Sequence, residues 1–292
     1  MQYYQNIEKD SKIIASLNYD TWKNDNRSIL ETLPQKDIIM SFTGGKDCSI
    51  ILEFLLQASN EFSFNFQTHA FLFPVHVFTT EEISKLDKYW NTKGVKINWH
   101  KLEHTDDEFE LAKNNGLNPC IVCHQRKREY FLEFLNRNFK KLDSIVIIVS
   151  FTLWDLVSYS LEQLLFFNLS FNTIDTSPTL DGKIIKDRFV QTSQRFYPFL
   201  IMKEGYSIYK PLLKYNDPEI TSIVQEKKIP LSSVECKYKS YRPKRLFSDC
   251  YKQMNLLFDY DKVLSFAKES LHLHDIAYYN NFTKDEFISD IL

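Results

Sequence analysis

The fold of this chain is decided by the segment Ser41-Phe42-Thr43-Gly44-Gly45-Lys46-Asp47-Cys48-Ser49. Residues 37–40 before it form a short, mostly apolar run, which predicts a buried strand. Residues 49–56 after it are apolar on most sides and lack glycine and proline, which predicts a buried helix. A strand, a Gly-Gly turn and a helix N-terminus form a cradle for phosphate, because the first N–H groups of a helix have no partner within it and the helix dipole favours negative charge.

Side chains of this loop add to the cradle. Lys46 supplies a cation, and Thr43 and Ser49 supply hydroxyl donors. The carboxylate of Asp47 would repel phosphates unless a cation bridges them, so it predicts Mg²⁺ carried in with a nucleotide. The alternative is a turn that only joins a strand to a helix. Because the chain has only 6 glycines in 292 residues, against about 7% in average proteins, two adjacent glycines here favour the binding function.

Length and composition indicate a globular protein. A chain of 292 residues can hold one large domain with a small appendage, and its 43% hydrophobic content supplies an ample core. The sequence contains no apolar run of about 18 residues, the length that a membrane span needs. Its start lacks the basic and apolar regions of a signal peptide, so we expect a cytoplasmic protein that has no membrane partner. The net charge of −2 gives no overall attraction to nucleic acid.

Strand-like and helix-like segments alternate after the loop. Residues 69–78 are β-rich and lead into a helix start at Thr79, and residues 95–102 have an alternating strand pattern. Residues 144–150 form the most strand-like run, whose continuous apolar character predicts a central parallel strand buried on both faces. This order predicts an α/β fold with a doubly wound, mainly parallel sheet and a nucleotide at the carboxyl ends of its strands.

The second informative segment is Pro119-Cys120-Ile121-Val122-Cys123-His124. The chain has 5 cysteines, an odd number, which favours thiol or metal chemistry over a disulfide framework. Cys120 and Cys123 lie at a predicted helix N-terminus followed by basic residues, a place that favours thiolates. Metal or Fe–S ligation, redox exchange and sulfur transfer through a persulfide all fit this pair. Two ordinary structural cysteines are the alternative.

The loop resembles the Ser-Gly-Gly-x-Asp-Ser motif of the PP-loop ATP pyrophosphatases. Members of that superfamily split ATP between its α- and β-phosphates and place AMP on a substrate oxygen. Thr43 stands in place of the first serine and Cys48 in place of the last, with Ser49 adjacent. The resemblance implies that the loop binds ATP and Mg²⁺. The binding residues that it implies are Thr43, Gly44, Gly45, Lys46, Asp47, Cys48 and Ser49.

Later motifs resemble the tRNA 2-thiocytidine synthetase branch of that superfamily, over roughly residues 36–240. In that branch three cysteines commonly hold a [4Fe–4S] cluster, and the matching residues here are Cys120, Cys123 and Cys236. The resemblance therefore leaves two forms of the site open. One is a [4Fe–4S] enzyme, and the other is an enzyme that transfers sulfur directly from its thiols.

The chain also departs from this branch. Of the Gly-His-x-x-Asp-Asp sequence that usually follows the central strand, only Asp155 is kept, and Lys210 replaces the arginine of an Arg-Pro-Leu segment. We interpret Cys250 as a thiol of the core rather than a ligand. The catalytic residues that the resemblance implies are Cys120, Cys123, Asp47 and Asp155.

Three regions are predicted along the chain. Residues 1–35 form a helical N-terminal segment, residues 36–235 form the PP-loop ATP-binding and thiolation domain, and residues 236–292 form a basic and aromatic, helical C-terminal extension. Within the domain, residues 171–215 have the spacing of hairpin strands, with a turn at residues 180–183.

The leading hypothesis is an ATP-dependent sulfurtransferase that forms AMP and pyrophosphate. It adenylates a nucleobase carbonyl and then replaces the oxygen with sulfur from a donor protein or from sulfide. The degraded branch signature and the balanced charge favour a free purine nucleotide, a guanine nucleotide above all, as in enzymes that make 6-thioguanine. The alternatives are 2-thiolation of tRNA by a [4Fe–4S] enzyme, an adenylating amide ligase and a regulatory protein without turnover. The oligomeric state is open, with a homodimer among the alternatives.

The pocket for a free nucleotide would need an aromatic ring to stack the base and cations for the phosphate. Phe151 or Trp154 could supply the ring, and Arg126 or Arg128 could supply the cation. Residues 237–245 interleave cations with aromatics, which is typical either of a phosphate- and base-binding surface or of a solvated surface strand.

Overall fold

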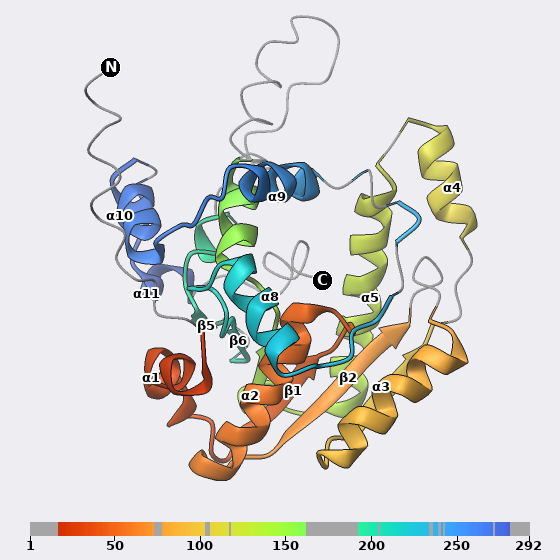
Figure 1. The fold of residues 1–292 in the computed structure, drawn as a ribbon, viewed down its shortest axis with the longest axis horizontal. Coiled ribbons are helices and arrows are strands. Elements are labelled where there is room, and N and C mark those ends of the chain that lie inside the picture. The colour runs from red at the N-terminus through yellow and green to blue at the C-terminus, as the bar shows by residue number, and fades with distance from the viewer. Residues whose placement is uncertain are drawn as a thin grey trace, which may run out of the picture.

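In the computed structural model, the described residues are 17–72, 78–102, 106–116, 118–161, 192–203, 205–233, 236–238, 241, 243–270 and 272–280 (Figure 1). The strands are β1 (Asp37–Ser41), β2 (Phe66–Leu72), β3 (Ile97–Lys101), β4 (Ile145–Ile148), β5 (Phe199–Ile201) and β6 (Ser207–Tyr209). The helices are α1 (Tyr19–Leu30), α2 (Lys46–Phe62), α3 (Thr80–Thr92), α4 (Asp107–Asn114), α5 (Pro119–Asn138), α8 (Asp217–Glu226), α9 (Pro243–Gln253), α10 (Tyr260–Ser270) and α11 (Ile276–Tyr279). Residues 153–161 are helical as well.

The strands form a six-stranded sheet in the order β3-β2-β1-β4-β6-β5. All neighbouring pairs are parallel except β5 and β6, which are antiparallel. This confirms the predicted doubly wound, mainly parallel sheet. From β1 the chain proceeds outward to β2 and β3, and it then returns to place β4 on the other side of β1. The topological switch point therefore lies between β1 and β4, where folds of this kind bind their ligands.

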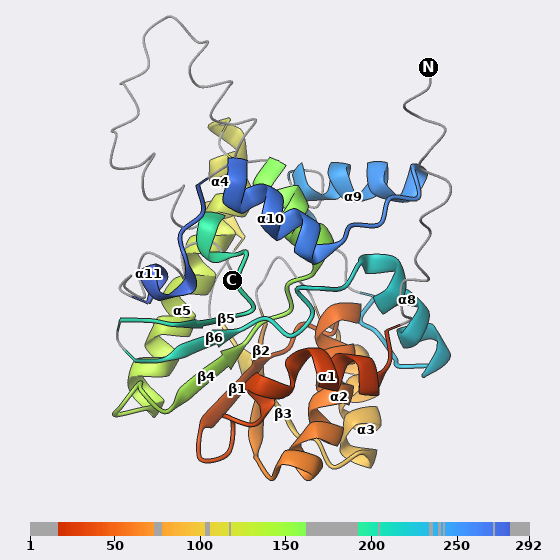
Figure 2. The same ribbon diagram turned by 90° about the vertical axis from the view of Figure 1, so that its left-hand side faces the viewer.

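The two central strands carry apolar runs, at residues 38–40 of β1 and 145–148 of β4, because helices cover both faces of the sheet (Figure 2). Side chains alternate between the faces along a strand. In β1, Ile38 and Met40 join the core beneath α1, α2, α3 and α8, whereas Ile39 joins the core beneath α5, α10 and α11. Residues 145–148 of β4 divide between the two cores in the same alternating way. A run that is apolar at every position thus marks a strand with two buried faces, as predicted for 144–150.

Both ends of the described chain pack on the sheet. Trp22 of α1 is fully buried, lies 5.2 Å from the Phe54 ring of α2, and donates its indole N–H to the Pro211 carbonyl at 3.0 Å. Residues Tyr260 and Ala267 of α10 belong to the core on the opposite face. The pairing of β5 with β6 confirms a hairpin within 171–215, and the predicted turn at 180–183 lies outside the described residues. None of the described helices combines the length and apolar character needed to cross a bilayer.

Candidate functional site

The loop that joins β1 to α2 leaves the start of a helix open. Gly45 is the residue before the first turn of α2, and no side chain caps that turn within the described part of the chain. Gly44 has φ +71°, and a Cβ there would lie 2.8 Å from the Cβ of Ser232. The Ser232 N–H also donates to the Gly44 carbonyl at 2.8 Å. Glycine is therefore required at position 44 by its conformation and by this close approach.

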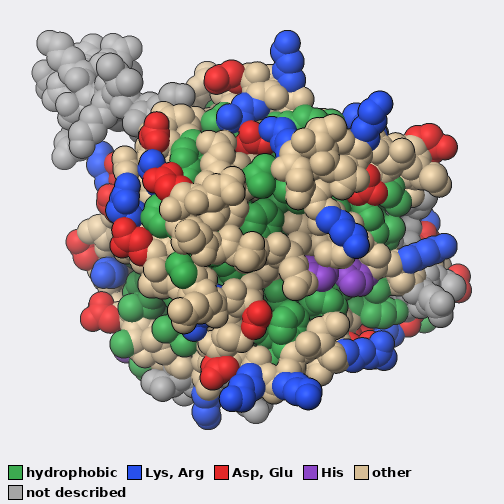
Figure 3. Space-filling model, turned by 90° about the horizontal axis from the view of Figure 1, so that it is seen from below, with side chains coloured by type: hydrophobic (Ala, Val, Ile, Leu, Met, Phe, Trp, Pro, Cys, Tyr) green, Lys and Arg blue, Asp and Glu red, His purple; other side chains and the backbone are tan. Residues whose placement is uncertain are grey.

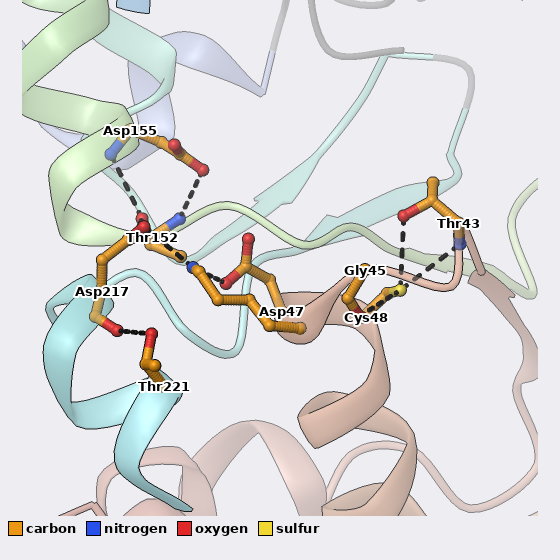
Figure 4. A network of polar contacts seen from close by, with 9 residues as sticks. Thr43, Gly45, Asp47, Cys48, Thr152, Asp155, Asp217 and Thr221 are labelled. Atoms are coloured by element: carbon orange, nitrogen blue, oxygen red, sulfur yellow. Dashed lines mark hydrogen bonds and ion pairs between the residues drawn. The ribbon is translucent and has the colours of Figure 1, made fainter. Parts of the chain in front are cut away.

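Cys48 closes the loop from within. Its Sγ accepts the Thr43 N–H at 3.3 Å, lies 3.3 Å from the Thr43 hydroxyl oxygen, and donates to the Gly45 carbonyl at 3.1 Å (Figure 4). The thiol is buried, and this burial raises its pKa. The adjacent Ser49 hydroxyl is also buried and makes no hydrogen bond to a described residue. Cys48 thus bridges the two sides of the loop as a neutral thiol.

Lys46 joins two carboxylates at the mouth of the loop. Its Nζ lies 2.5 Å from Oδ1 of Asp47 and 2.8 Å from Oδ2 of Asp217, the first residue of α8. Burial lowers the pKa of Lys46, but the charges of Asp47 and Asp217 outweigh it and hold the pKa above its usual value. Burial raises the pKa of Asp47, and the negative charges of Asp217 and Asp155 add to this effect while Lys46 opposes it. One ammonium between two carboxylates leaves net negative charge at the mouth of the loop.

Asp155 supports this group from the helical residues after β4. Its Oδ2 accepts the Thr152 N–H at 3.1 Å, and its own N–H donates to the Thr152 hydroxyl oxygen at 3.2 Å. The same hydroxyl donates to Oδ1 of Asp217 at 3.0 Å (Figure 4). Asp155 is buried, and its hydrogen bonds with Thr152 link it through Asp217 to Lys46 of the loop. The structure thus brings the predicted residues Lys46, Asp47 and Asp155 together through residues that the sequence reasoning did not assign to the site.

Asp217 is the functional candidate that the sequence reasoning missed. In the sequence, Asp217-Pro218-Glu219 has the pattern of a helix start, because acids and proline are both favoured there. In the structure Glu219 performs the capping, since its Oε2 accepts the Asn216 N–H at 2.8 Å. Asp217 is thereby left to face Lys46. No local signal separates these two acids, so only the packing of α8 against α2 reveals the difference.

The predicted thiols lie together at the start of α5. Asn118 caps this helix by accepting the Cys120 N–H at 2.9 Å, so both Cys120 and Cys123 belong to its first two turns. They share one apolar cluster with Cys236. Phe71 and Leu102, at the carboxyl ends of β2 and β3, pack on the same cluster, which places the thiols on the edge of the sheet that carries the loop. Among the described residues, however, no three His, Cys, Asp or Glu side chains are placed to hold a metal ion.

The predicted stacking residues differ in their surroundings. Trp154 is buried against Tyr251 of α9, with ring centroids 5.4 Å apart, so it has no face for a base, and that expectation is wrong. Phe151 is partly exposed and lies 5.6 Å from the Arg195 guanidinium, which leaves it as the remaining aromatic candidate.

The predicted phosphate cation is engaged elsewhere. Arg126 binds Glu108 at 2.6 Å and Glu129 at 2.6 Å, so its guanidinium is already paired. The side chain of Arg128 lies outside the described set. The interpretation of Cys250 as a core thiol is wrong, because this side chain of α9 is exposed.

Known proteins resemble this chain in fold but not in sequence. No protein-family model and no curated protein sequence matches the chain. The U34-tRNA thiolase NcsA from Methanococcus maripaludis, solved with its [4Fe-4S] cluster, aligns with a TM-score of 0.58 and 14% identity over 88% of this chain and 82% of that one. The chain shares the fold of this thiolase.

Two further structures align more distantly. NMN synthetase from Francisella tularensis has a TM-score of 0.43 and 8% identity, over 92% of this chain and 96% of that one. NAD+ synthetase from Burkholderia pseudomallei has a TM-score of 0.42 and 12% identity, over 87% of each chain.

Proposed function

We propose that this chain is an ATP-dependent sulfurtransferase that forms AMP and pyrophosphate and thiolates a nucleobase carbonyl. One observation carries the proposal. An open helix N-terminus with Lys46 and Asp47 lies at the same edge of the sheet as a Cys120/Cys123 pair at the start of a second helix. A phosphate cradle and a thiol pair on one edge provide the two halves of such a reaction, which are activation of an oxygen and its replacement by sulfur.

Activation of the substrate is the task of the loop. The N–H groups of the first turn of α2 and the Lys46 ammonium bind the β- and γ-phosphates of ATP. The carbonyl oxygen of the base attacks the α-phosphorus, the bond to the β-phosphate breaks, and pyrophosphate leaves. Oxide is a poor leaving group, whereas AMP attached to the base is a good one, so the carbon of the former carbonyl becomes open to attack.

The residues at the loop fit a Mg²⁺ ion that accompanies ATP. Mg²⁺ is commonly bound by one or two carboxylates together with substrate phosphates. Asp47 and Asp217 are both drawn to the single cation Lys46, which shows that their carboxylates can serve one positive charge. Asp47 and Asp217 would hold the ion, which would supply charge neutralisation of the phosphates. Thr152 and Asp155 keep Asp217 in place through their hydrogen bonds.

Sulfur transfer is the task of the thiol pair. A donor protein loads Cys120 as a persulfide, whose terminal sulfur attacks the activated carbon while AMP leaves with the original oxygen. The Cys123 thiol then attacks the Cys120 sulfur, the S–S bond to the product breaks, and the thiolated base is released. The resulting Cys120–Cys123 disulfide is reduced by an external dithiol. Because the described cysteines are not placed to hold a metal ion, no step is assigned to a [4Fe–4S] cluster.

The proposed substrate is a free purine nucleotide, a guanine nucleotide above all. Binding of tRNA requires many contacts to its phosphates, which a basic protein surface supplies. The chain has 36 basic against 38 acidic residues, and on the face seen in Figure 3 the two kinds of side chain are interspersed. Phe151, which follows β4 and precedes Thr152, would stack the base beside the loop.

The test offers the purified chain ATP, GMP and a sulfur donor, with Lys46→Met as control. We expect AMP and pyrophosphate in equal amounts and a sulfur-for-oxygen mass shift of the nucleotide, and both should be lost in the control. Release of ADP and phosphate would overturn the mechanism. A Cys120→Ser/Cys123→Ser variant should release pyrophosphate without thiolating the base. Full turnover by that variant with ammonia in place of sulfur would favour the amide ligase instead.

The second candidate is thiolation of tRNA, which the shared fold with the tRNA thiolase NcsA favours. The same assay with bulk tRNA in place of GMP separates the two substrates. Thiolation of tRNA but not of GMP, with an affinity for tRNA that falls steeply as the salt concentration increases, would make tRNA the substrate instead of the free nucleotide. Anaerobic purification tests the metal-free thiol pair, because visible absorbance from an iron–sulfur cluster in an active enzyme would contradict it.

A further inference from the structure

The first two residues of the basic and aromatic segment after α8, Lys237 and Tyr238, contact α4. Lys237 binds Glu110 of α4 at 2.5 Å and lies 3.7 Å from Asp106. Tyr238 is buried, and its ring stacks on that of Phe109 at a centroid distance of 6.0 Å. The interpretation of this stretch as a binding surface therefore fails at its first two residues, whose cation and ring are both engaged by α4.

The same segment contacts the start of α5. The Cys120 thiol points at the Tyr238 carbonyl at 3.8 Å, and the Asn118 amide donates to the Tyr241 carbonyl at 3.1 Å. Asn118 is also the residue that caps α5 and holds the Cys120 N–H. One asparagine thus fixes both the helix that carries Cys120 and the segment that carries Cys236.

We infer that residues 236–238 and 241 form a clasp that positions Cys236 against Cys120 and Cys123, with Tyr238 as its anchor. Cys236 itself belongs to no helix or strand, and the two residues that follow it, Lys237 and Tyr238, are held by side chains of α4. The inference rests on the proposed function only for the use of the third thiol, which would be to complete the sulfur-handling centre. The positioning itself is a property of the fold.

The contacts of the clasp differ in weight. The Lys237 and Glu110 side chains are 52% and 35% exposed, and ion pairs of this kind contribute little because solvent screens them. The Tyr238 ring lies in the apolar cluster with the fully buried Phe109, and its hydroxyl donates to Glu110 at 2.7 Å. Burial of an aromatic ring with its polar tip satisfied is the larger contribution. Tyr238 should therefore decide the position of Cys236, and Lys237 should only adjust it.

The experiment uses the full chain carrying Cys250→Ser, which removes the exposed thiol. A short bifunctional maleimide is added without ATP or nucleotide, and joined tryptic peptides are identified by mass spectrometry. We expect a product that links Cys236 to Cys120 or Cys123. Tyr238→Phe keeps the ring and should retain this product, whereas Tyr238→Ala should reduce its rate of formation about tenfold or more, since the buried ring is lost. Lys237→Met should change it by about threefold or less.

Circular dichroism and thermal melting verify that each variant is folded. Cross-linking of folded Tyr238→Ala at the rate of the parent, or absence of a Cys236 product in the parent, would overturn the clasp. Because the reagent needs no turnover, these results are independent of the ATP and GMP assay. A clasp that cross-links as expected in a chain that releases no pyrophosphate would refute the proposed function alone.

Discussion

Asp217 lies 2.8 Å from the ammonium group of Lys46, although the two residues begin different helices far apart in the sequence. Lys46 opens α2 after the first strand, and Asp217 opens α8 after the last. The two helices pack against each other on one face of the sheet, so their N-termini meet at the switch point between β1 and β4. The loop at the first strand is therefore completed by an acid that follows all six strands of the sheet in the chain.

Replacement of Asp217 tests this completion. Asp217→Asn removes the charge that holds Lys46 but keeps a side chain of the same size. We expect kcat/KM for ATP to fall about 10- to 100-fold, the value of a hydrogen bond between charged groups. Asp37→Asn is the matched control, because Asp37 lies at the opposite end of β1 and binds only Ser144 among the side-chain contacts seen for it. An equal loss in both variants would contradict a specific role for Asp217.

Gly44 is predicted to be irreplaceable for two separable reasons. Gly44→Ala would impose φ +71° on alanine and bring its Cβ to 2.8 Å from Ser232, whereas Gly116 has φ +72° with nothing within 4 Å. Gly116→Ala should cost about 1 to 2 kcal/mol of unfolding free energy from backbone strain alone. Gly44→Ala should cost more, and Ser232→Gly in the same chain should recover part of the difference, since Leu86 also lies 3.3 Å from the added Cβ. Urea unfolding measures all three variants, and equal losses at the two glycines would contradict the steric part.

Cys48 is predicted to react with alkylating reagents more slowly than the exposed Cys250. Burial raises its pKa, so less of it is thiolate at any given pH, and the thiolate is the reactive form. Iodoacetamide at pH 8 should therefore modify the exposed Cys250 well before Cys48, as followed by peptide mass spectrometry. Cys48→Ser should retain pyrophosphate release, because a hydroxyl can bridge Thr43 and Gly45 as the thiol does. Rapid alkylation of Cys48 in the folded chain would show that the loop is open.

The folded chain is predicted to lose stability in mild acid because of His69. Its ring lies 2.9 Å from that of His100, and burial, with the charge of His100 as a second cause, lowers the pKa of His69 to about 4. Below pH 6.5 the His69 ring is protonated in the unfolded chain but stays neutral in the folded chain. The free energy of unfolding therefore falls as the pH drops towards 4. Between pH 7 and pH 5 the loss from His69 should be about 2 kcal/mol. Urea unfolding at the two values should show a smaller loss in His69→Gln, and an unchanged loss would contradict the assignment.

The sequence was sufficient for the features that depend on neighbours in the chain. Residues 37–56 predict strand, turn and helix by their own pattern, and the apolar run 144–150 predicts a strand buried on both faces, as β4 is. The sequence also predicts a helix N-terminus at Cys120 and Cys123, and α5 begins there at Pro119 with Asn118 as its cap. These elements fix an α/β sheet because a parallel strand order with intervening helices leaves few other arrangements.

Only the tertiary structure decided which distant side chains share a site. Asp217 and Glu219 are equivalent in a sequence, and the packing of α8 on α2 gives one to Lys46 and the other to the helix cap. The sequence suggested Trp154 as a ring that could stack a base, but Tyr251 packs against it and it is buried. Lys237 and Tyr238 likewise contact α4 instead of forming a binding surface. Local patterns record what a residue favours by itself, whereas its partner is set by burial and charge from segments that meet only when the chain has folded.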